Sequence, residues 1–248
     1  MTRILCVANQ KGGVGKTTTS INLAAGLGQA GCATLLIDLD PQCNATTGLG
    51  HTPTDRHPIV NNESLENSIQ ASHYENLDVL PGSRSFQDVS ALAEGKYVES
   101  DKLQEHIRHS TSKYEFVIID CPPSVGPLTQ SALAASTEVF MPIQCEYFAM
   151  EGLTQMIHVI RDVMHQENSQ LEFGGIVLTM YDPHLELTTE IDNEVREFFG
   201  DIVFDTVIPR DSLLAESPSY NKPILDYAPR SRGARAYTEL CMEVLERE

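Results

Sequence analysis

The sequence predicts an α/β protein built on a doubly wound, mostly parallel sheet of about seven or eight strands flanked by helices. Short apolar runs of strand length alternate along the chain with longer segments of helical spacing, which is the pattern of repeated βαβ units. Several of these runs end directly at a glycine-rich loop or an acidic residue, as strands do at the ligand-binding edge of such a sheet. With 248 residues and 41% hydrophobic content, the chain suits one domain spanning residues 1–248.

The first strand, loop and helix form the strongest signal. Residues 3–8 are an apolar run, residues 10–16 read QKGGVGK, and residues 17–30 have helical spacing with Gly31 as a stop. Glycines let the backbone close around an anion, and the N–H groups at a helix start attract phosphate. Lys16 supplies a point charge and Thr17 a hydroxyl suited to Mg²⁺. The predicted phosphate-binding residues are Gly12, Gly13, Val14, Gly15, Lys16, Thr17 and Thr18.

This loop departs from the strict P-loop pattern. The pattern requires glycine at the position that Gln10 occupies, and a second lysine, Lys11, precedes Lys16 by five residues. A glycine-rich turn with two solvated lysines is the simpler alternative. The strand before the loop and the helix after it favour a phosphate cradle, in which one lysine is surplus.

The second strand, residues 33–38, leads into the sequence Asp38-Leu39-Asp40-Pro41. Because ligands bind at the carboxyl ends of parallel strands, Asp38 and Asp40 are expected beside the phosphate-binding loop. One carboxylate could hold Mg²⁺ through water and the other could orient an attacking water. The alternative is that both cap a turn before the proline.

The middle of the chain carries no chemistry that its sequence indicates. Residues 52–62 are polar with two prolines and predict a surface loop. Residues 65–71 are a short helix candidate, residues 77–80 a short strand, and residues 102–109 a moderately amphipathic helix.

The third strong signal is residues 114–120, an apolar strand that ends at Asp120 and is followed by Cys121-Pro122-Pro123-Ser124. In P-loop proteins an aspartate at such a strand end completes the Mg²⁺ site opposite the loop Ser or Thr, so Asp120 is a metal-site candidate. The prolines stiffen a loop suited to reporting on the γ-phosphate. Further strands are predicted at residues 138–143, 174–180 and 202–208, and further helices at residues 128–135, 150–166, 187–199 and 233–246.

Composition limits the functions that the chain can perform. The net charge of −18 argues against coating nucleic acid by bulk electrostatics. Six cysteines never fall in a C-x-x-C spacing, which indicates reduced thiols in a cytoplasmic protein. The sequence has no apolar run near 18 residues and no cleavable leader, so membrane association is not expected.

Three motifs together resemble one known family. The lysine-first loop, the DLDPQ stretch at residues 38–42 and the DCPPS stretch at residues 120–124 are similar to those of the ParA/Soj partition ATPases, within the MinD/ParA deviant Walker class of SIMIBI-type P-loop proteins. The resemblance covers nearly the whole chain, including residues 44–46 (NAT), 144–147 (QCEY), 208–210 (IPR) and 222–224 (KPI).

The resemblance implies ATP and Mg²⁺ as cofactors and a homodimer that forms on ATP binding. Lys11 would then reach across the dimer to the partner's phosphates, Lys16 would hold its own nucleotide, and Asp40 would polarise the attacking water. Thr17, Asp38 and Asp120 would support the metal. Strand ends near Thr179 and at Pro209 and Arg210 are expected beside the adenine. By the same resemblance, hydrolysis would split the dimer, and a ParB-like partner would speed it through a short basic N-terminal peptide.

Non-specific DNA binding, the family's second property, is less well supported by this sequence. Relatives often carry arginines where this chain reads Pro183-His184-Leu185 and Asp211-Ser212-Leu213. Residues 182–205 contain eight acidic residues and one basic residue, which would repel a duplex or simply form a solvated helix face. The candidate DNA contacts that remain, besides Arg210, are Lys222, Arg230, Arg232 and Arg235.

Three alternative functions remain open at this stage. The same ATPase switch could position a protein cargo without DNA. A MinD-like membrane mode would use the apolar stripe of the last helix, although acidic residues on its polar side favour core packing instead. An iron–sulfur ATPase would use Cys121 and Cys145, against the simpler alternative of buried, inert thiols. The stripe comprises Tyr237, Leu240, Cys241, Val244 and Leu245, opposite Glu239, Glu243, Glu246 and Glu248.

Overall fold

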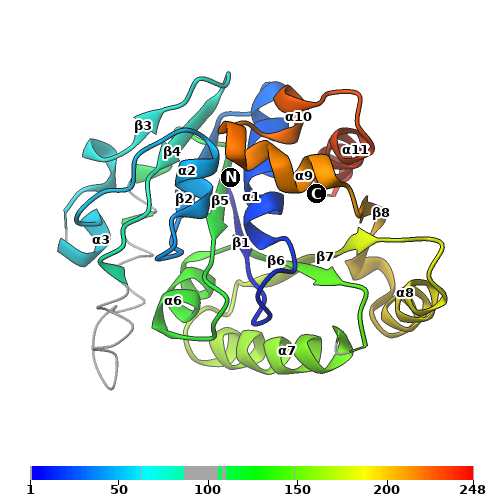
Figure 1. The fold of residues 1–248 in the computed structure, drawn as a ribbon. Coiled ribbons are helices and arrows are strands. Elements are labelled where there is room, and N and C mark those ends of the chain that lie inside the picture. Colours follow the sequence, from blue (N-terminus) through cyan, green and yellow to red (C-terminus); the bar gives the residue numbers. More distant parts are fainter. Residues whose placement is uncertain (1, 62, 87–105, 108–109, 148, 248) are drawn as a thin grey trace.

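A computed structural model describes residues 2–61, 63–86, 106–107, 110–147 and 149–247 (Figure 1). Its strands form one sheet in the order β3-β4-β2-β5-β1-β6-β7-β8, and every neighbouring pair is parallel except β3 with β4. The predicted doubly wound, mostly parallel sheet is therefore confirmed. The strands are β1 (Arg3–Val7), β2 (Thr34–Asp38), β3 (Gln70–Ala71), β4 (Leu77–Leu80), β5 (Phe116–Asp120), β6 (Glu138–Gln144), β7 (Glu172–Tyr181) and β8 (Val203–Pro209).

Helices cover both faces of this sheet. Helices α6 (Pro127–Ala135), α7 (Ala149–Gln166) and α8 (Glu186–Phe199) pack on one face, and α1 (Lys16–Gln29), α10 (Ile224–Tyr227) and α11 (Arg232–Glu246) on the other (Figure 1). The remaining helical segments in the described part of the chain are short. They are α2 (Asn44–Gly48), α3 (Pro58–Asn61), α9 (Ser212–Glu216) and 3₁₀ turns at Leu65–Asn67, Gly200–Ile202 and Ser217–Tyr220.

The central strands are apolar throughout because both of their faces are covered. In β1, Leu5 and Val7 pack against the core beneath α1 and α11, whereas Ile4 and Cys6 pack against the core beneath α6 and α7. This two-sided burial explains why the strands appear in the sequence as continuous apolar runs rather than alternating ones.

The strand register brings the predicted functional residues to one edge. Val7 and Asp38 are each register partners of Asp120, on either side of β5. The loop after β1, the acidic stretch after β2 and the acid that ends β5 therefore meet at the carboxyl edge of three neighbouring strands, as expected for this fold.

The predicted helix over residues 65–71 is wrong. The N–H groups of Ser68 and Ile69 both bond to the carbonyl of Leu65, which closes a single 3₁₀ turn, and Gln70 and Ala71 then form β3 antiparallel to β4. Pairing with the free edge of β4 satisfies backbone groups that a short exposed helix would leave to water. Residues 58–61 form a short helix within the predicted surface loop, and most of the predicted helix at residues 102–109 lies outside the described residues.

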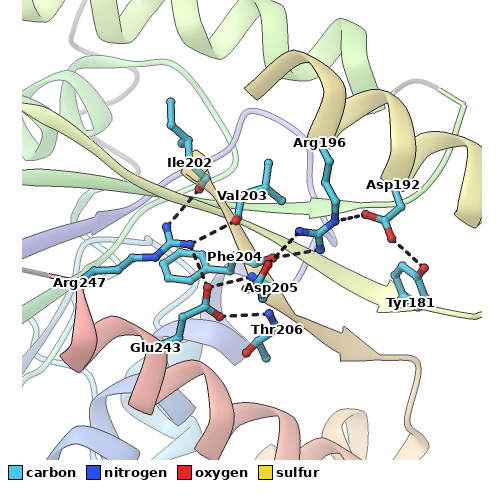
Figure 2. Close-up of polar contacts among 10 residues, drawn as sticks. All are labelled: Tyr181, Asp192, Arg196, Ile202, Val203, Phe204, Asp205, Thr206, Glu243 and Arg247. Carbon is cyan, nitrogen blue, oxygen red and sulfur yellow. Dashed lines mark hydrogen bonds and ion pairs between the residues drawn. The ribbon is translucent and has the colours of Figure 1, made fainter. Parts of the chain in front are cut away.

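The last helix closes the edge of the sheet at β8 (Figure 2). The Glu243 carboxylate accepts hydrogen bonds from the N–H groups of Asp205 (2.8 Å) and Thr206 (3.1 Å), and Arg247 donates to the carbonyls of Ile202 and Val203. These contacts occupy backbone groups that an edge strand otherwise exposes.

The apolar side of α11 belongs to the core, not to a membrane-facing surface. Tyr237, Leu240, Cys241 and Val244 are buried against α1 and the sheet, whereas Leu245 is partly exposed. No helix among the described residues is both long enough and apolar enough to cross a membrane.

Candidate nucleotide-binding site

The loop between β1 and α1 depends on two glycines in left-handed conformations. Gly13 has φ of 75°, and Gly15, the residue immediately before α1, has φ of 89°. L-residues with a side chain rarely adopt these values, so glycine permits the turn that directs the first amides of α1 toward the loop. Such a helix start, with unpaired N–H groups and a positive dipole end, is suited to bind phosphate.

The two lysines of the loop diverge. Lys16 is buried, and its Nζ donates to the backbone carbonyl of Lys11 (3.0 Å), inside the loop. Burial lowers the pKa of Lys16, while the negative charges of Asp120 and Asp40 act in the opposite direction. The Nζ of Lys11 instead forms an ion pair with the exposed Glu146 (2.7 Å). The two side chains therefore extend in different directions, Lys16 into its own loop and Lys11 toward the surface.

Asp120 lies at the end of β5 beneath the start of α1. Its two oxygens accept hydrogen bonds from the hydroxyls of Thr17 (2.9 Å) and Ser20 (2.8 Å). Complete burial, followed by the charge of Asp38, raises the pKa of Asp120. Sequence analysis missed Ser20, although its position three residues after Thr17 places both hydroxyls on one face of the helix.

Asp38 holds the segment that follows β2 in place through hydrogen bonds. Its carboxylate accepts hydrogen bonds from the N–H (2.8 Å) and hydroxyl (2.6 Å) of Thr46 and from the N–H of Asp40 (3.1 Å). Asp40 is buried, its Oδ1 accepts from the N–H of Gln42 (2.9 Å), and burial raises its pKa. Thr46, which lies eight residues beyond Asp38, was not singled out as a site residue from the sequence.

The residues present suit Mg²⁺ better than a metal that needs a full protein cage. Among the described residues, no group of three His, Cys, Asp or Glu side chains could hold a metal ion. Mg²⁺ is commonly bound through one or two protein oxygens, waters and the phosphates of a nucleotide. The Thr17 hydroxyl and the neighbouring Asp120 carboxylate are oxygen donors of this kind.

The two cysteines of the iron–sulfur alternative lie in the core. The Sγ of Cys121 is 3.4 Å from that of Cys6, and Cys145 is buried in the core beneath α6 and α7. The hydrogen bond between Cys121 and Cys6, followed by burial, raises the pKa of Cys121. Burial raises the pKa of Cys145 to about 12. Both therefore behave as buried, protonated thiols.

A pocket of about 370 Å³ adjoins the phosphate-binding loop. It contains Pro209 and Arg210, as well as Thr179, which the sequence placed near an adenine. Its mainly apolar walls suit a flat heterocyclic ring better than another phosphate. The full lining is Gly15, Thr18, Thr179, Met180, Ile208, Pro209, Arg210, Asp211, Ser212, Leu214, Ala215 and Tyr237.

Of the candidate DNA contacts, Arg210 lines this pocket, whereas the other four are not among its lining residues. Arg230, Arg232 and Arg235 are exposed at the start of α11, and Arg232 donates to the backbone carbonyl of Arg210 (3.3 Å). Lys222 forms an ion pair with Asp226 (2.9 Å). Helix α8 presents an acidic surface formed by Glu186, Glu190, Glu194 and Glu197.

Strand, glycine loop, helix and buried strand-end aspartates define a P-loop nucleotide-binding protein, and comparison with known proteins agrees. A sequence family described as an AAA domain matches residues 2–173. The sporulation initiation inhibitor protein Soj of Bacillus subtilis is 43% identical over 98% of both chains. The chromosome partitioning protein ParA of Caulobacter vibrioides is 43% identical over 99% of this chain and 95% of its own.

This chain belongs to the ParA/Soj family of P-loop ATPases, as the three sequence motifs indicated. Its fold is also that of a solved structure, cobyrinic acid a,c-diamide synthase from Mycobacterium smegmatis with bound ADP and magnesium. That chain is 32% identical, has a TM-score of 0.83 and matches over 99% of this chain and 94% of its own.

Proposed function

We propose that residues 1–248 form a single Mg²⁺-dependent ATPase domain that acts as a slow switch in chromosome or plasmid partitioning. ATP binding joins two copies into a sandwich dimer, and hydrolysis to ADP and phosphate separates them. A ParB-like partner accelerates hydrolysis. Membership of the ParA/Soj family supports this function, and so do the ADP and magnesium bound to the similar synthase structure.

One observation carries the proposed dimer: the two loop lysines point to different places. Lys16 Nζ is bonded back into its own loop, where a bound phosphate would lie, whereas Lys11 Nζ reaches an exposed carboxylate on the surface. A cation directed away from its own cradle can neutralise phosphates that a second copy presents. We assign Lys16 to the chain's own nucleotide and Lys11 to that of the partner.

Thr17 and three aspartates are assigned to metal binding, to support of the loop after β2 and to orientation of the attacking water. Thr17 and Asp120 would hold Mg²⁺, which when bound neutralises charge on the phosphate oxygens. Asp38 keeps the following segment in place through Thr46 and Asp40. Asp40 orients the attacking water, and its raised pKa makes its carboxylate a better proton acceptor.

The base is proposed to occupy the pocket beside the loop. Gly15 and Thr18 line it from the loop side, while Pro209 and Arg210 line it from the end of β8. The phosphates and the base would therefore contact adjoining surfaces, as a single nucleotide requires.

A second candidate function is a switch that positions a protein cargo without DNA. The acidic surface of α8 favours it, because negative charge repels a duplex. The basic cluster at the start of α11 favours DNA instead. The two functions share the ATPase cycle and differ only in what the dimer binds, which is DNA in the first and a protein cargo in the second.

Size-exclusion chromatography of the Asp40→Ala protein tests the switch. We expect a stable dimer with ATP and Mg²⁺ and a monomer without them, because hydrolysis no longer resets the dimer. Adding Lys11→Ala should abolish the dimer while leaving monomer ATP binding intact, whereas adding Lys16→Ala should abolish binding itself. Lys113→Ala, which removes an exposed lysine outside the site, is the matched control.

Two outcomes would contradict these assignments. A dimer that survives Lys11→Ala would remove the trans role of that lysine. Normal ATP turnover in the Asp40→Ala protein would remove Asp40 from the mechanism. Phosphate release measured with and without a basic peptide from a ParB-like protein then tests the proposed activation.

A further inference from the structure

Met180, in the wall of the proposed base pocket, has an unusual backbone conformation. Its φ is 51°, in the left-handed region that residues with side chains other than Asn and Asp rarely occupy. The register of β7 with β8 explains how the strand accommodates it. Leu178 pairs with Val207 and Tyr181 with Pro209, so that two residues of β7 stand opposite one of β8. Met180 therefore belongs to a β-bulge that bends the strand at the pocket.

Both neighbours of Met180 are held by specific hydrogen bonds. Before it, the Thr179 hydroxyl donates to the carbonyl of Val14 in the phosphate-binding loop (2.9 Å). After it, the Tyr181 carbonyl accepts from the N–H of Arg210 (3.0 Å), and the Tyr181 hydroxyl donates to the Asp192 carboxylate (2.8 Å). A strained conformation persists only where surrounding contacts determine it in this way.

The hydrogen bond between Tyr181 and Asp192 is in turn supported by contacts to β8 (Figure 2). Asp192 in α8 forms an ion pair with Arg196 one turn later (2.6 Å), and the Arg196 guanidinium donates to the carbonyl of Phe204 in β8 (3.0 Å). Asp205 lies farther out, 3.7 Å from the same guanidinium, and is fully exposed. Tyr181, Asp192 and Arg196 thus join the end of β7, the middle of α8 and the start of β8 in one connected set.

The protonation states suit this arrangement. Burial, followed by the hydrogen bond to Asp192, raises the pKa of Tyr181 to about 12, so its hydroxyl keeps its proton and remains a donor at neutral pH. The Arg196 guanidinium is always charged, and its side chain also neutralises the Asp192 carboxylate. The set therefore has one donor, one acceptor and one cation, with each group satisfied.

We propose that Tyr181, Asp192 and Arg196 are positioning residues that hold Met180 in its left-handed conformation and thereby shape the pocket wall against which the nucleotide base packs. Among the described residues, the polar partners of these three side chains lie in α8 and β8 and not in the phosphate-binding loop. Their effect is on recognition of the base and not on recognition of the phosphates. The proposal rests on the nucleotide-binding function assigned to the adjoining loop and pocket.

Calorimetric titration with two ligands, ATP and inorganic tripolyphosphate, both with Mg²⁺, tests it. Tripolyphosphate has no base and reports on the loop alone. Removing one hydroxyl by Tyr181→Phe should weaken ATP binding about five- to tenfold, because a single hydrogen bond is lost, and should change tripolyphosphate binding less than about twofold. Asp205→Asn, which alters the exposed end of the same cluster, should change neither.

A rescue experiment separates positioning from general stability. Asparagine adopts the left-handed conformation far more readily than methionine, so a Met180→Asn protein needs the Tyr181 contact less. In that background, Tyr181→Phe should weaken ATP binding less than about twofold. A merely structural role would give the same loss in both backgrounds.

Several results would overturn the inference. Equal loss of ATP and tripolyphosphate affinity in Tyr181→Phe would show a general effect on the loop, and an undiminished loss in the Met180→Asn background would show that Met180 is not the link. If Tyr181→Phe leaves the ratio of ATP affinity to tripolyphosphate affinity at its wild-type value, the positioning role is contradicted. The base pocket and the proposed function are then not affected. A wild-type protein that binds both ligands equally contradicts the base pocket, and one that binds neither contradicts the proposed function.

Discussion

Lys11 and Lys16 are separated by five positions and share one loop, yet their side chains have different environments. Lys16 is buried and bonded to a backbone carbonyl, and Lys11 is half-exposed and paired with Glu146. The Lys11 backbone is held as well, since its N–H donates to Asn9 Oδ1 (3.0 Å) and Asn9 Nδ2 donates to the Pro142 carbonyl (2.8 Å). The backbone of the loop is thus held in place, and in the proposed dimer the Lys11 side chain would exchange Glu146 for the partner's nucleotide.

Glu146→Gln should therefore favour the ATP dimer. An exposed ion pair contributes no more than about 1 kcal/mol, so thermal stability should change little, while a released Lys11 should lower the protein concentration needed for dimerisation about two- to fivefold. Sedimentation velocity with ATP in the Asp40→Ala background measures the change. Asp226→Asn, which breaks a comparable surface pair with Lys222, should have no effect. Weaker dimerisation in Glu146→Gln would assign Glu146 a supporting role instead.

His57 makes stability depend on pH. The ring is buried against Phe86, Nδ1 accepts from the N–H of Ile59, and no described residue pairs with Nε2. Burial lowers its pKa to about 3. In the unfolded chain the imidazole binds a proton with a pKa near 6.5, whereas in the folded chain it stays neutral down to about pH 3. The contribution of His57 to the free energy of unfolding is therefore fully present above about pH 6.5 and is lost as the pH falls toward 3.

His57→Asn should flatten this dependence, because asparagine can still accept from Ile59 but does not titrate. Urea unfolding at pH 7.5 and pH 5 should show a smaller difference in unfolding free energy than for wild type, by about 1 to 2 kcal/mol. His184→Gln, at an exposed histidine, should leave the difference unchanged. An unaltered pH dependence in His57→Asn would place the acid sensitivity elsewhere.

At the scale of elements, α1 connects the phosphate-binding loop to the core and has little free space near its end. A Cβ at Gly28 would lie 2.6 Å from the carbonyl oxygen of Glu75, and the Asn76 side chain donates to the Gly28 carbonyl (3.1 Å). The backbone before β4 thus packs directly on the last turn of the helix. In contrast, a Cβ at Gly152 in α7 would meet no atom within 4 Å.

The same substitution should therefore have opposite effects in the two helices. Gly28→Ala should destabilise the protein by about 1 to 3 kcal/mol because backbone must move. Gly152→Ala should stabilise it by up to about 1 kcal/mol, since alanine loses less chain entropy in a helix. Chemical denaturation measures both. Equal effects at the two positions would mean that the close approach at Gly28 relaxes without cost.

At the scale of the whole molecule, a net charge of −18 coexists with a small basic cluster at the start of α11. Any DNA contact must therefore be local, and its strength must depend steeply on salt, because counterion release from phosphates drives it. The acidic surface of α8 works against the same contact.

We expect the Asp40→Ala dimer with ATP to be retained on DNA at low salt and released by about 0.2 M NaCl. Replacing both Arg230 and Arg235 by alanine should abolish retention, whereas Glu190→Gln with Glu194→Gln should extend it to higher salt. A bead-retention assay across a salt series measures all three proteins. No retention at low salt would favour the protein-cargo function.

The sequence alone determined the fold class, the family and the order of the central strands and long helices, and it predicts the phosphate-binding loop residues. These depend on local patterns: two-sided burial gives continuous apolar runs, and phosphate binding needs glycines and a lysine at fixed spacing. The 3₁₀ turn and β3 were missed because edge pairing with β4, not local spacing, decides them.

Only the tertiary structure decided which distant side chains meet. Thr46 bonds Asp38, Glu146 pairs with Lys11 and Asp192 holds Tyr181, contacts that depend on crossover connections and strand register. Local propensity carries no information about such pairs, and the left-handed Met180 shows why: the contacts that sustain its strain come from three elements that only the folded sheet brings together.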